Sequence, residues 1–177
     1  HQLAPEGEMD DCKGEWLVCS PKNIYDFSAI GFVFGRKLHK ELHAPVGMIQ
    51  STWGGTHAES WTKMEVMKKN PLYAGVLKDF ALENVKQKKG YCKVPATLWN
   101  GMIKPILGYT VKGNICYQGE SNSIRYEDYQ QVFTNLINSW RKEWKQPDMP
   151  FYFMQIAPHK GQPAGIREAQ LKTWQGG

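Results

Sequence analysis

The sequence predicts an α/β fold with a parallel sheet. Three apolar runs of strand type, at Val46–Ile49, Ile115–Tyr117 and Phe151–Ile156, are separated by segments with helical periodicity. The second of these runs stops abruptly at a polar cluster that extends from Gln118 to Asn122. In an open parallel sheet, ligands bind just outside the carboxyl ends of the strands, so we expect the chemistry to lie near Gln118.

A helix is expected before the first apolar run. Ser20 stands where an N-cap is expected, Pro21 takes the first helical position, and apolar spacing predicts an amphipathic helix over Asn23–Leu42. Its two glycines, Gly31 and Gly35, cost helix stability and therefore indicate close packing on a sheet.

The remaining predicted helices lie between and after the apolar runs. The segment before the second apolar run, Val94–Leu107, is expected to be irregular with one short buried helix. The clearest helical stripe lies between the second and third runs. The predicted helices are Glu59–Lys69, Leu72–Lys89, Tyr126–Lys145 and Ile166–Trp174.

Composition excludes several classes of function. The net charge of +5 comes from scattered lysines without a basic aromatic face, which argues against nucleic-acid binding. The four cysteines form no CxxC pair, which argues against a zinc or redox site, and the sequence leaves open whether Cys12 and Cys19 are bridged. The sequence contains no run of about 18 apolar residues, so it predicts no membrane span. Three strands are few for a sheet and the chain starts without a signal peptide, so we expect part of a domain to be missing.

A loop of small residues follows the first apolar run and contains Gly54 and Gly55. Such a loop between a strand and a helix exposes backbone N–H groups to whatever lies above the sheet. The alternative is that the two glycines only form a tight turn.

Taken together, several stretches resemble the sialate O-acetylesterase and carbohydrate acetylesterase family, a branch of the SGNH hydrolases. They run in the same order across nearly the whole chain, and YQGESN and SxWGGTxAExW are the specific motifs. The stretches are VCSPKNIYDFSAIGFVFGRKLHKEL from Val18, PVGMIQSTWGGTHAESW from Pro45, LWNGMIKPIL from Leu98, GNICYQGESN from Gly113 and FYFMQIAP from Phe151. The resemblance implies a single hydrolase domain over residues 1–177, with a flavodoxin-like three-layer α/β/α sandwich and a parallel sheet.

The resemblance also implies an activity. Members of the family remove O-acetyl groups from sialic acids or plant polysaccharides such as xylan through an acyl-enzyme on a serine, without a cofactor or a metal. The family's serine lies in a GQSNM-like block and its Asp and His in a DxHP-like block. Neither block occurs in this sequence, so we expect the chain alone to lack the nucleophile and the base. Secretion or a periplasmic location is expected by resemblance. The alternative is a non-catalytic carbohydrate-binding or structural remnant of the same fold.

The catalytic parts that carry over are those of the oxyanion hole. The family pattern places a backbone N–H of Gly54 or Gly55 and the side-chain amide of Gln118 at the oxygen that gains negative charge. Glu120 is expected either to support Gln118 or to be a structural carboxylate. Three residues are expected to bind the sugar: Trp53, His57 and Asn122.

A local catalytic triad is a weaker hypothesis. Ser121 could pair with His57 or His159, but GESN is not a GxSxG elbow and Ser121 follows the strand end by three residues. The simpler interpretation of His159 is an exposed loop residue, and that of Trp61 is core packing. Two residues of the last predicted helix could close the floor of the pocket: Arg167 and Gln170.

Overall fold

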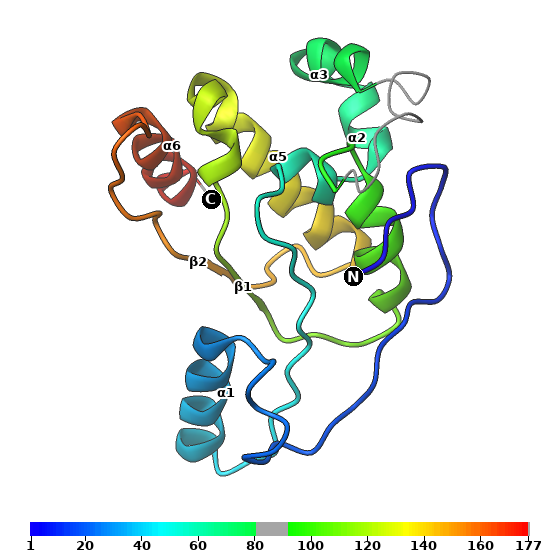
Figure 1. Cartoon of the computed structure of the whole chain (residues 1–177), viewed down its shortest axis with the longest axis vertical. Coiled ribbons are helices and arrows are strands. Elements are labelled where there is room, and N and C mark those ends of the chain that lie inside the picture. Colours follow the sequence, from blue (N-terminus) through cyan, green and yellow to red (C-terminus); the bar gives the residue numbers. More distant parts are fainter. Residues whose placement is uncertain (81–91, 177) are drawn as a thin grey trace. The chain divides into compact units, whose positions relative to one another are not determined.

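The computed structural model describes residues 1–80 and 92–176 (Figure 1). Contacts divide the chain into a smaller unit, residues 13–52, and a larger unit made of residues 1–12 with those from Trp53 onward. The smaller unit contains α1 (Ala29–Leu42). The larger unit contains α2 (Met64–Lys68), α3 (Ala74–Asp79), β1 (Asn114–Cys116), α5 (Tyr126–Glu143), β2 (Phe151–Phe153) and α6 (Ala164–Gln175).

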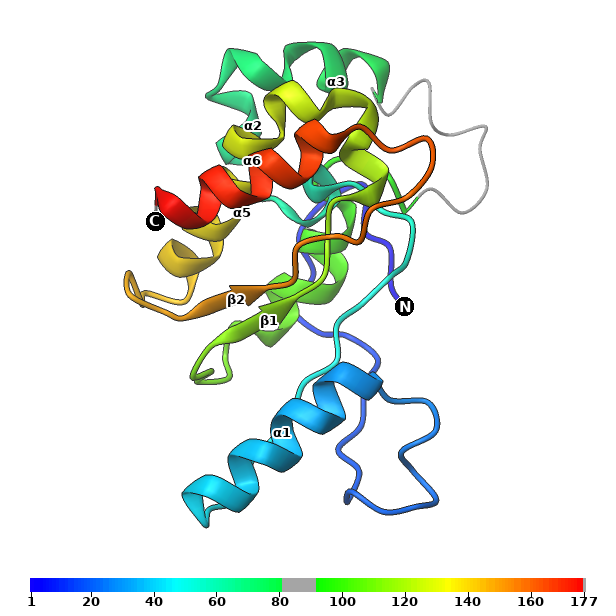
Figure 2. The ribbon, with the colours of Figure 1, turned by 90° about the vertical axis from the view of Figure 1, so that its left-hand side faces the viewer.

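A parallel pair of strands confirms the predicted parallel pairing, and the described chain is otherwise mostly helical. β1 lies beside β2, with Asn114 opposite Phe151 and Cys116 opposite Phe153. The helix α5 connects the two strands, as a parallel connection requires. Figure 2 shows α5 and α6 on the same side of the two strands.

The core of the larger unit lies between α5 and the strand pair. Phe133 of α5 is fully buried and meets the rings of Phe151 and Phe153 edge to face, at centroid distances of 6.1 and 5.0 Å. Tyr129, one turn earlier, stacks on Phe133 at 5.4 Å. These contacts confirm the helical stripe predicted in this segment, because its apolar residues face one core.

Two strand predictions are wrong, one because the strand is absent and one because the strand is shorter than expected. Val46–Ile49 forms no strand, because the smaller unit has no β-strand to pair with it within residues 13–52. The third run was expected to be a buried strand to Ile156, but β2 ends at Phe153 and its side chains alternate between the two faces. Tyr152 is 61% exposed, whereas Phe153 packs on the core.

The helix of the smaller unit begins later than predicted. α1 starts at Ala29 because the hydroxyl of Ser28 accepts the backbone N–H of Gly31 at 3.2 Å, which makes Ser28 the N-cap in place of Ser20. Residues 20–27 form turns instead. The two glycines were predicted to pack closely on a sheet, but the smaller unit has no strand within residues 13–52. Close packing is found at Gly35 against a side chain instead, where a Cβ would lie 2.9 Å from Met48.

The helices between Ala58 and Asp79 are shorter than predicted. The expected helix over Glu59–Lys69 is divided into a 3₁₀ turn at Ala58–Trp61 and α2, because Thr62 has an extended ψ of 137°. Its hydroxyl donates back to the carbonyl of Ala58 at 3.0 Å, a local bond that competes with the helical ladder. The later part of the expected Leu72–Lys89 helix lies outside the described residues, whereas α3 covers Ala74–Asp79.

One prediction is confirmed, and one question that the sequence left open is answered. Val94–Leu107 contains a short buried π-helical turn at Trp99–Ile103. All four cysteines are free thiols, so Cys12 and Cys19 are not bridged. Cys116, at the end of β1, is half-buried as a residue, but burial of its thiol, with the Glu120 carboxylate nearby, raises the pKa to about 12.

Candidate active site

Gln118 follows the carboxyl end of β1, as the sequence predicted, and its side chain is held on three sides. Its Nε2 donates to Asn122 Oδ1 at 3.0 Å and to the backbone carbonyl of Thr56 at 3.3 Å. Its Oε1 accepts from the hydroxyl of Tyr129. The amide of Gln118 is therefore fixed in direction within its own loop and against the loop that contains Thr56.

The two glycines before Thr56 form an exposed turn. Gly55 has a φ of 72°, in the left-handed region that favours glycine, and a Cβ on either glycine would meet open space. The hydroxyl of Thr56 closes the turn by donating to the carbonyl of Trp53 at 2.8 Å and accepting from Trp61 Nε1 at 2.9 Å. Within residues 1–80 and 92–176, neither glycine N–H donates a hydrogen bond. The turn thus presents two unused donors.

The loop after β1 and the glycine turn meet through two hydrogen bonds. One is the bond from Gln118 to the Thr56 carbonyl, and the other runs from the backbone N–H of Ala58 to Asn122 Oδ1 at 2.9 Å. The structure therefore brings together Gln118 and the residue that directly follows Gly55. The predicted meeting of these two loops at one strand end is present in the fold.

Gln170 and Tyr129 fix the backbone at the end of β1. Gln170 Nε2 donates to the Gln118 carbonyl at 2.9 Å, and its Oε1 accepts the backbone N–H of Ile156 at 3.0 Å. The Tyr129 hydroxyl lies 3.1 Å from the same carbonyl of Gln118. Burial raises the pKa of Tyr129 well above its usual range, so the hydroxyl keeps its proton as a donor. Gln170 is buried at 1% exposure, so it supports the site from within rather than facing a ligand.

An ion pair that the sequence did not predict adjoins the site through Asn122. Glu59 is fully buried, and its carboxylate binds the guanidinium of Arg125 through one oxygen and Asn122 Nδ2, at 2.8 Å, through the other. Glu59 stands in the WGGTxAExW motif and Arg125 follows QGESN by three residues, so both lie next to motifs that were recognised. Only the fold shows that they are partners, because 66 residues separate them.

His57 lies between the two loops. Its ring lies near the backbone of Ser121 and makes an edge-to-face contact with Phe80 at 6.3 Å. Burial lowers the pKa of His57 below its ordinary value of 6.5, and the Glu59 carboxylate offsets part of that shift. A neutral imidazole next to Gln118 adds a polar group to the site without adding charge at pH 7.

The other predicted site residues have different surroundings. Glu120 is exposed and, among the described residues, makes no hydrogen bond to Gln118. Trp53 is half-buried and packs against the ring of His1 at 4.4 Å. Asn122 is 2% exposed and all of its side-chain polar atoms have protein partners, which favours a positioning role over the predicted contact with a sugar.

The alternatives to an external nucleophile receive no support from the geometry. No hydrogen bond within the described part of the chain joins the Ser121 hydroxyl to His57 or His159. His159 is exposed, and Trp61 is buried with its indole N–H bonded to Thr56, which confirms both of the simpler interpretations. Arg167 is half-buried, and its carbonyl accepts from Gln155.

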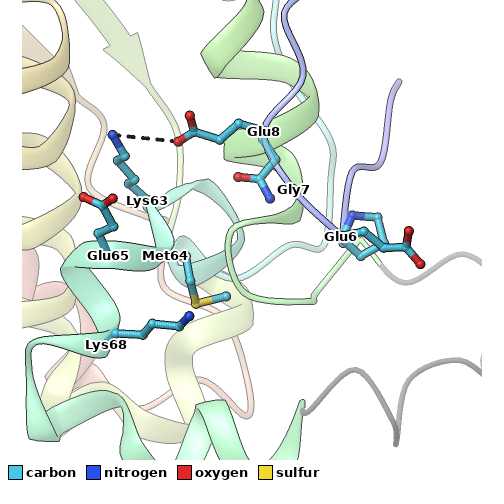
Figure 3. A pocket seen from close by; sticks show the side chains of 9 residues that line it. Glu6, Gly7, Glu8, Lys63, Met64, Glu65 and Lys68 are labelled. Carbon is cyan, nitrogen blue, oxygen red and sulfur yellow. Dashed lines mark ion pairs between the residues drawn. The ribbon is translucent and has the colours of Figure 1, made fainter.

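A separate cavity of about 380 Å³ lies elsewhere in the larger unit (Figure 3). Its lining includes Lys63, which pairs with Glu143 at 3.0 Å and lies 3.8 Å from Glu8. No residue of the predicted site lines this cavity. Charges of both signs compensate one another in it, so it presents no single charge to a ligand.

No cluster of three or more His, Cys, Asp or Glu residues suited to a metal occurs within residues 1–80 and 92–176. Over the same residues, no helix has both the length and the apolar character needed to cross a bilayer.

Comparison with known proteins identifies the family of the chain. Residues 19–175 match the family described as carbohydrate esterase, sialic acid-specific acetylesterase. A parallel strand pair with an amide held beside a glycine turn thus belongs to a carbohydrate esterase fold, and the chain is a member of the sialic acid-specific acetylesterase family.

The individual relatives are also acetylesterases by name. The chain is 38% identical to the human (Homo sapiens) sialate O-acetylesterase over 79% of its length and 27% of that protein's, and 30% identical to the mouse (Mus musculus) enzyme over 77% and 30%. The crystal structure of a carbohydrate acetylesterase from Xanthomonas citri superposes with a TM-score of 0.82 at 28% identity, covering 99% of this chain and 39% of the other. The chain thus spans about 30% of the length of the curated relatives that it matches.

Proposed function

We propose that this chain supplies the oxyanion hole of a serine esterase that removes O-acetyl groups from carbohydrates, either sialic acids or plant polysaccharides. The observation that carries the proposal is the position of Gln118 Nε2, 3.3 Å from the carbonyl of the residue that follows the Gly54–Gly55 turn. Family membership supports the same reaction. The whole domain in this proposal is a three-layer α/β/α sandwich of a protein exported to act on glycans.

The chemistry requires neutral donors at a fixed place. When a nucleophile attacks an acetyl ester, negative charge develops on the carbonyl oxygen, and preorganised N–H groups stabilise that charge. The amides of Gly54 and Gly55 are exposed and unclaimed among the described residues, so either can donate. The carboxamide of Gln118 does not titrate and can donate at any working pH. Loss of one such donor typically lowers kcat by about 10²–10³-fold.

In this proposal Gln118 exchanges one hydrogen bond when the substrate binds. Both hydrogens of Nε2 are used within the chain, toward Asn122 Oδ1 at 3.0 Å and toward the Thr56 carbonyl at 3.3 Å. The longer bond is the one released to the ester oxygen. The shorter bond keeps the amide in place, so the exchange needs a small rotation rather than a new side-chain conformation.

The remaining catalytic groups are part of the proposal as well. An acyl-enzyme requires a serine nucleophile and a base, which the family carries in motifs that do not occur in these 177 residues. His57 and Trp53 lie beside the glycine turn and are proposed to line the sugar pocket. Glu120 is exposed, which favours a role at the entrance over direct support of Gln118.

A second candidate function is a non-catalytic carbohydrate-binding or structural member of the same fold. The observation that favours it is the full use of the Gln118 amide within the chain, because such an amide can also serve only to join two loops.

Release of acetate separates the two candidates. The full-length protein is incubated with O-acetylated sialic acid and with acetylated xylan, in the wild-type form and as Gln118→Ala. The proposed function predicts acetate from at least one substrate and a loss of about 10²–10³-fold in kcat for the variant. Wild-type turnover by Gln118→Ala would remove Gln118 from the reaction, and no turnover by either protein would favour the non-catalytic candidate.

A further inference from the structure

Asn122 is the side chain that connects the two halves of the proposed oxyanion hole. It is 2% exposed. Its Oδ1 accepts from Gln118 Nε2 at 3.0 Å and from the backbone N–H of Ala58 at 2.9 Å, and its Nδ2 donates to Glu59 Oε2 at 2.8 Å. One carboxamide thus holds the Gln118 amide and the backbone just after the glycine turn.

The direction of these hydrogen bonds is forced by the groups at their ends. The Ala58 N–H can only donate, so the atom of Asn122 that faces it must be the oxygen. The nitrogen of Asn122 then faces the carboxylate of Glu59, and the atom of Gln118 that faces Oδ1 must be its own nitrogen. A flipped Asn122 amide would place its nitrogen against the N–H of Ala58 and the nitrogen of Gln118, donor against donor. A flipped Gln118 amide would place its oxygen against Asn122 Oδ1 and the Thr56 carbonyl, acceptor against acceptor. The arrangement therefore selects the orientation in which the Gln118 nitrogen points toward the glycine turn.

Glu59 provides the fixed end of this chain of bonds. A fully buried carboxylate is retained only where charge and hydrogen bonds compensate its desolvation. Arg125 supplies the charge and Asn122 supplies the hydrogen bond. The Arg125 side chain is 30% exposed, so it can turn to water if its partner is lost, whereas the buried Asn122 cannot.

We propose that Asn122 is a positioning residue for Gln118, anchored by Glu59, rather than a residue that contacts the sugar. This inference rests on the proposed esterase function. The bond from Asn122 persists when the Thr56 carbonyl is exchanged for the ester oxygen. Because its oxygen also holds Ala58, Asn122 fixes the spacing between the Gln118 donor and the donors of the glycine turn.

Three substitutions distinguish positioning from general stability. Asn122→Leu keeps the size of the side chain and removes the acceptor for Gln118. Glu59→Leu removes the acceptor for Asn122 Nδ2. Glu59→Gln keeps one oxygen for Asn122, and its amide nitrogen then faces Arg125, which can move to solvent. Positioning therefore predicts that Glu59→Gln restores part of what Glu59→Leu loses.

The matched control is Glu143→Gln. Glu143 also belongs to a largely buried ion pair, with Lys63 at 3.0 Å and side-chain exposures of 22% and 19%, but it makes no contact with Gln118. A general loss of stability affects this control as well as the three test variants. A change that is specific to Gln118 affects the test variants and leaves this control unaffected.

The direct measurement is the side-chain amide signal of Gln118 in ¹H–¹⁵N NMR spectra of the full-length protein, assigned by its disappearance in Gln118→Ala. We expect this signal to shift in Asn122→Leu and Glu59→Leu, and to stay near its wild-type position in Glu143→Gln. Steady-state kinetics below the melting temperature should show kcat lowered on the order of 10- to 100-fold in the two leucine variants with KM almost unchanged.

Each failure has its own meaning. An unmoved Gln118 signal in folded Asn122→Leu overturns the positioning role, as does wild-type kcat in that variant when Gln118→Ala is inactive. Wild-type kcat in Gln118→Ala itself overturns the proposed function, and the positioning role falls with it. If Asn122→Leu does not fold, the comparison of Glu59→Leu with Glu59→Gln decides, and equal losses in both overturn the inference.

Discussion

Gly119 is the residue at which a single methyl group should most directly disturb the end of β1. Its φ is 142°, a conformation that L side chains rarely adopt. A Cβ would lie 3.1 Å from Gln170 Nε2 and 3.2 Å from the hydroxyl oxygen of Tyr129. Both of these groups hold the backbone carbonyl of Gln118. Gly119→Ala therefore combines backbone strain with displacement of two buried donors.

The expected loss follows from these two effects. Strain at such a backbone position costs about 1–3 kcal/mol, and a weakened buried hydrogen bond about 1 kcal/mol more. We predict that Gly119→Ala lowers the free energy of unfolding by about 2–4 kcal/mol. Gly54→Ala is the control, since a Cβ there meets nothing within 4 Å, and it should change the free energy by less than about 1 kcal/mol.

Urea unfolding followed by tryptophan fluorescence measures both variants. We predict a lower midpoint for Gly119→Ala, a midpoint close to that of the wild type for Gly54→Ala, and slopes equal to that of the wild type. Equal midpoints for the two variants would refute this prediction, because the contacts at Gly119 would then carry no stability.

Three further predictions address the core, a thiol and the histidine. Phe133→Ala should lower the free energy of unfolding by about 3–5 kcal/mol, since Phe133 is fully buried against both strands; a loss below about 1 kcal/mol in calorimetry would contradict this packing. In native protein at pH 8, iodoacetamide should label the exposed Cys19 and leave Cys116, whose pKa is about 12, unlabelled by mass spectrometry; early labelling of Cys116 would contradict its burial. The pKa of His57, measured by NMR, should lie below 6.5. The folded state then binds fewer protons than the unfolded state, so the contribution of His57 to stability should fall as the pH drops from 6.5 toward the folded pKa. A measured pKa above 6.5 would mean that this contribution rises instead as the pH drops.

The sequence predicted those elements whose evidence is local. The stripe of α5 is long and regular enough to identify both the helix and its buried face. The end of β1 was identified because an apolar run changes to polar residues at Gln118. The start of α1 was missed because Ser20 and Ser28 both satisfy the local rule for an N-cap. In the structure Gln50, 22 residues further on, accepts the backbone N–H of Ser28 at 2.5 Å, a contact that local patterns do not contain.

The candidate site shows the same division between local and distant information. Motifs placed Gln118 and the glycine turn in one neighbourhood, and two hydrogen bonds between their loops agree with this. Asn122 and Arg125 both bind Glu59, which lies more than 60 positions earlier in the chain. Composition and spacing do not predict such pairs. A strand at Val46–Ile49 was likewise predicted from its own residues, although a strand exists only with a partner.

The most direct test of the proposed oxyanion hole is a crystal structure of the full-length protein after reaction with a phosphonate that mimics the tetrahedral intermediate. We predict that Gln118 Nε2 and the N–H of Gly54 or Gly55 lie about 2.7–3.1 Å from the same phosphonyl oxygen, with the bond from Gln118 to the Thr56 carbonyl broken. A phosphonyl oxygen bound by other donors, with Gln118 still bonded to Thr56, would contradict the account.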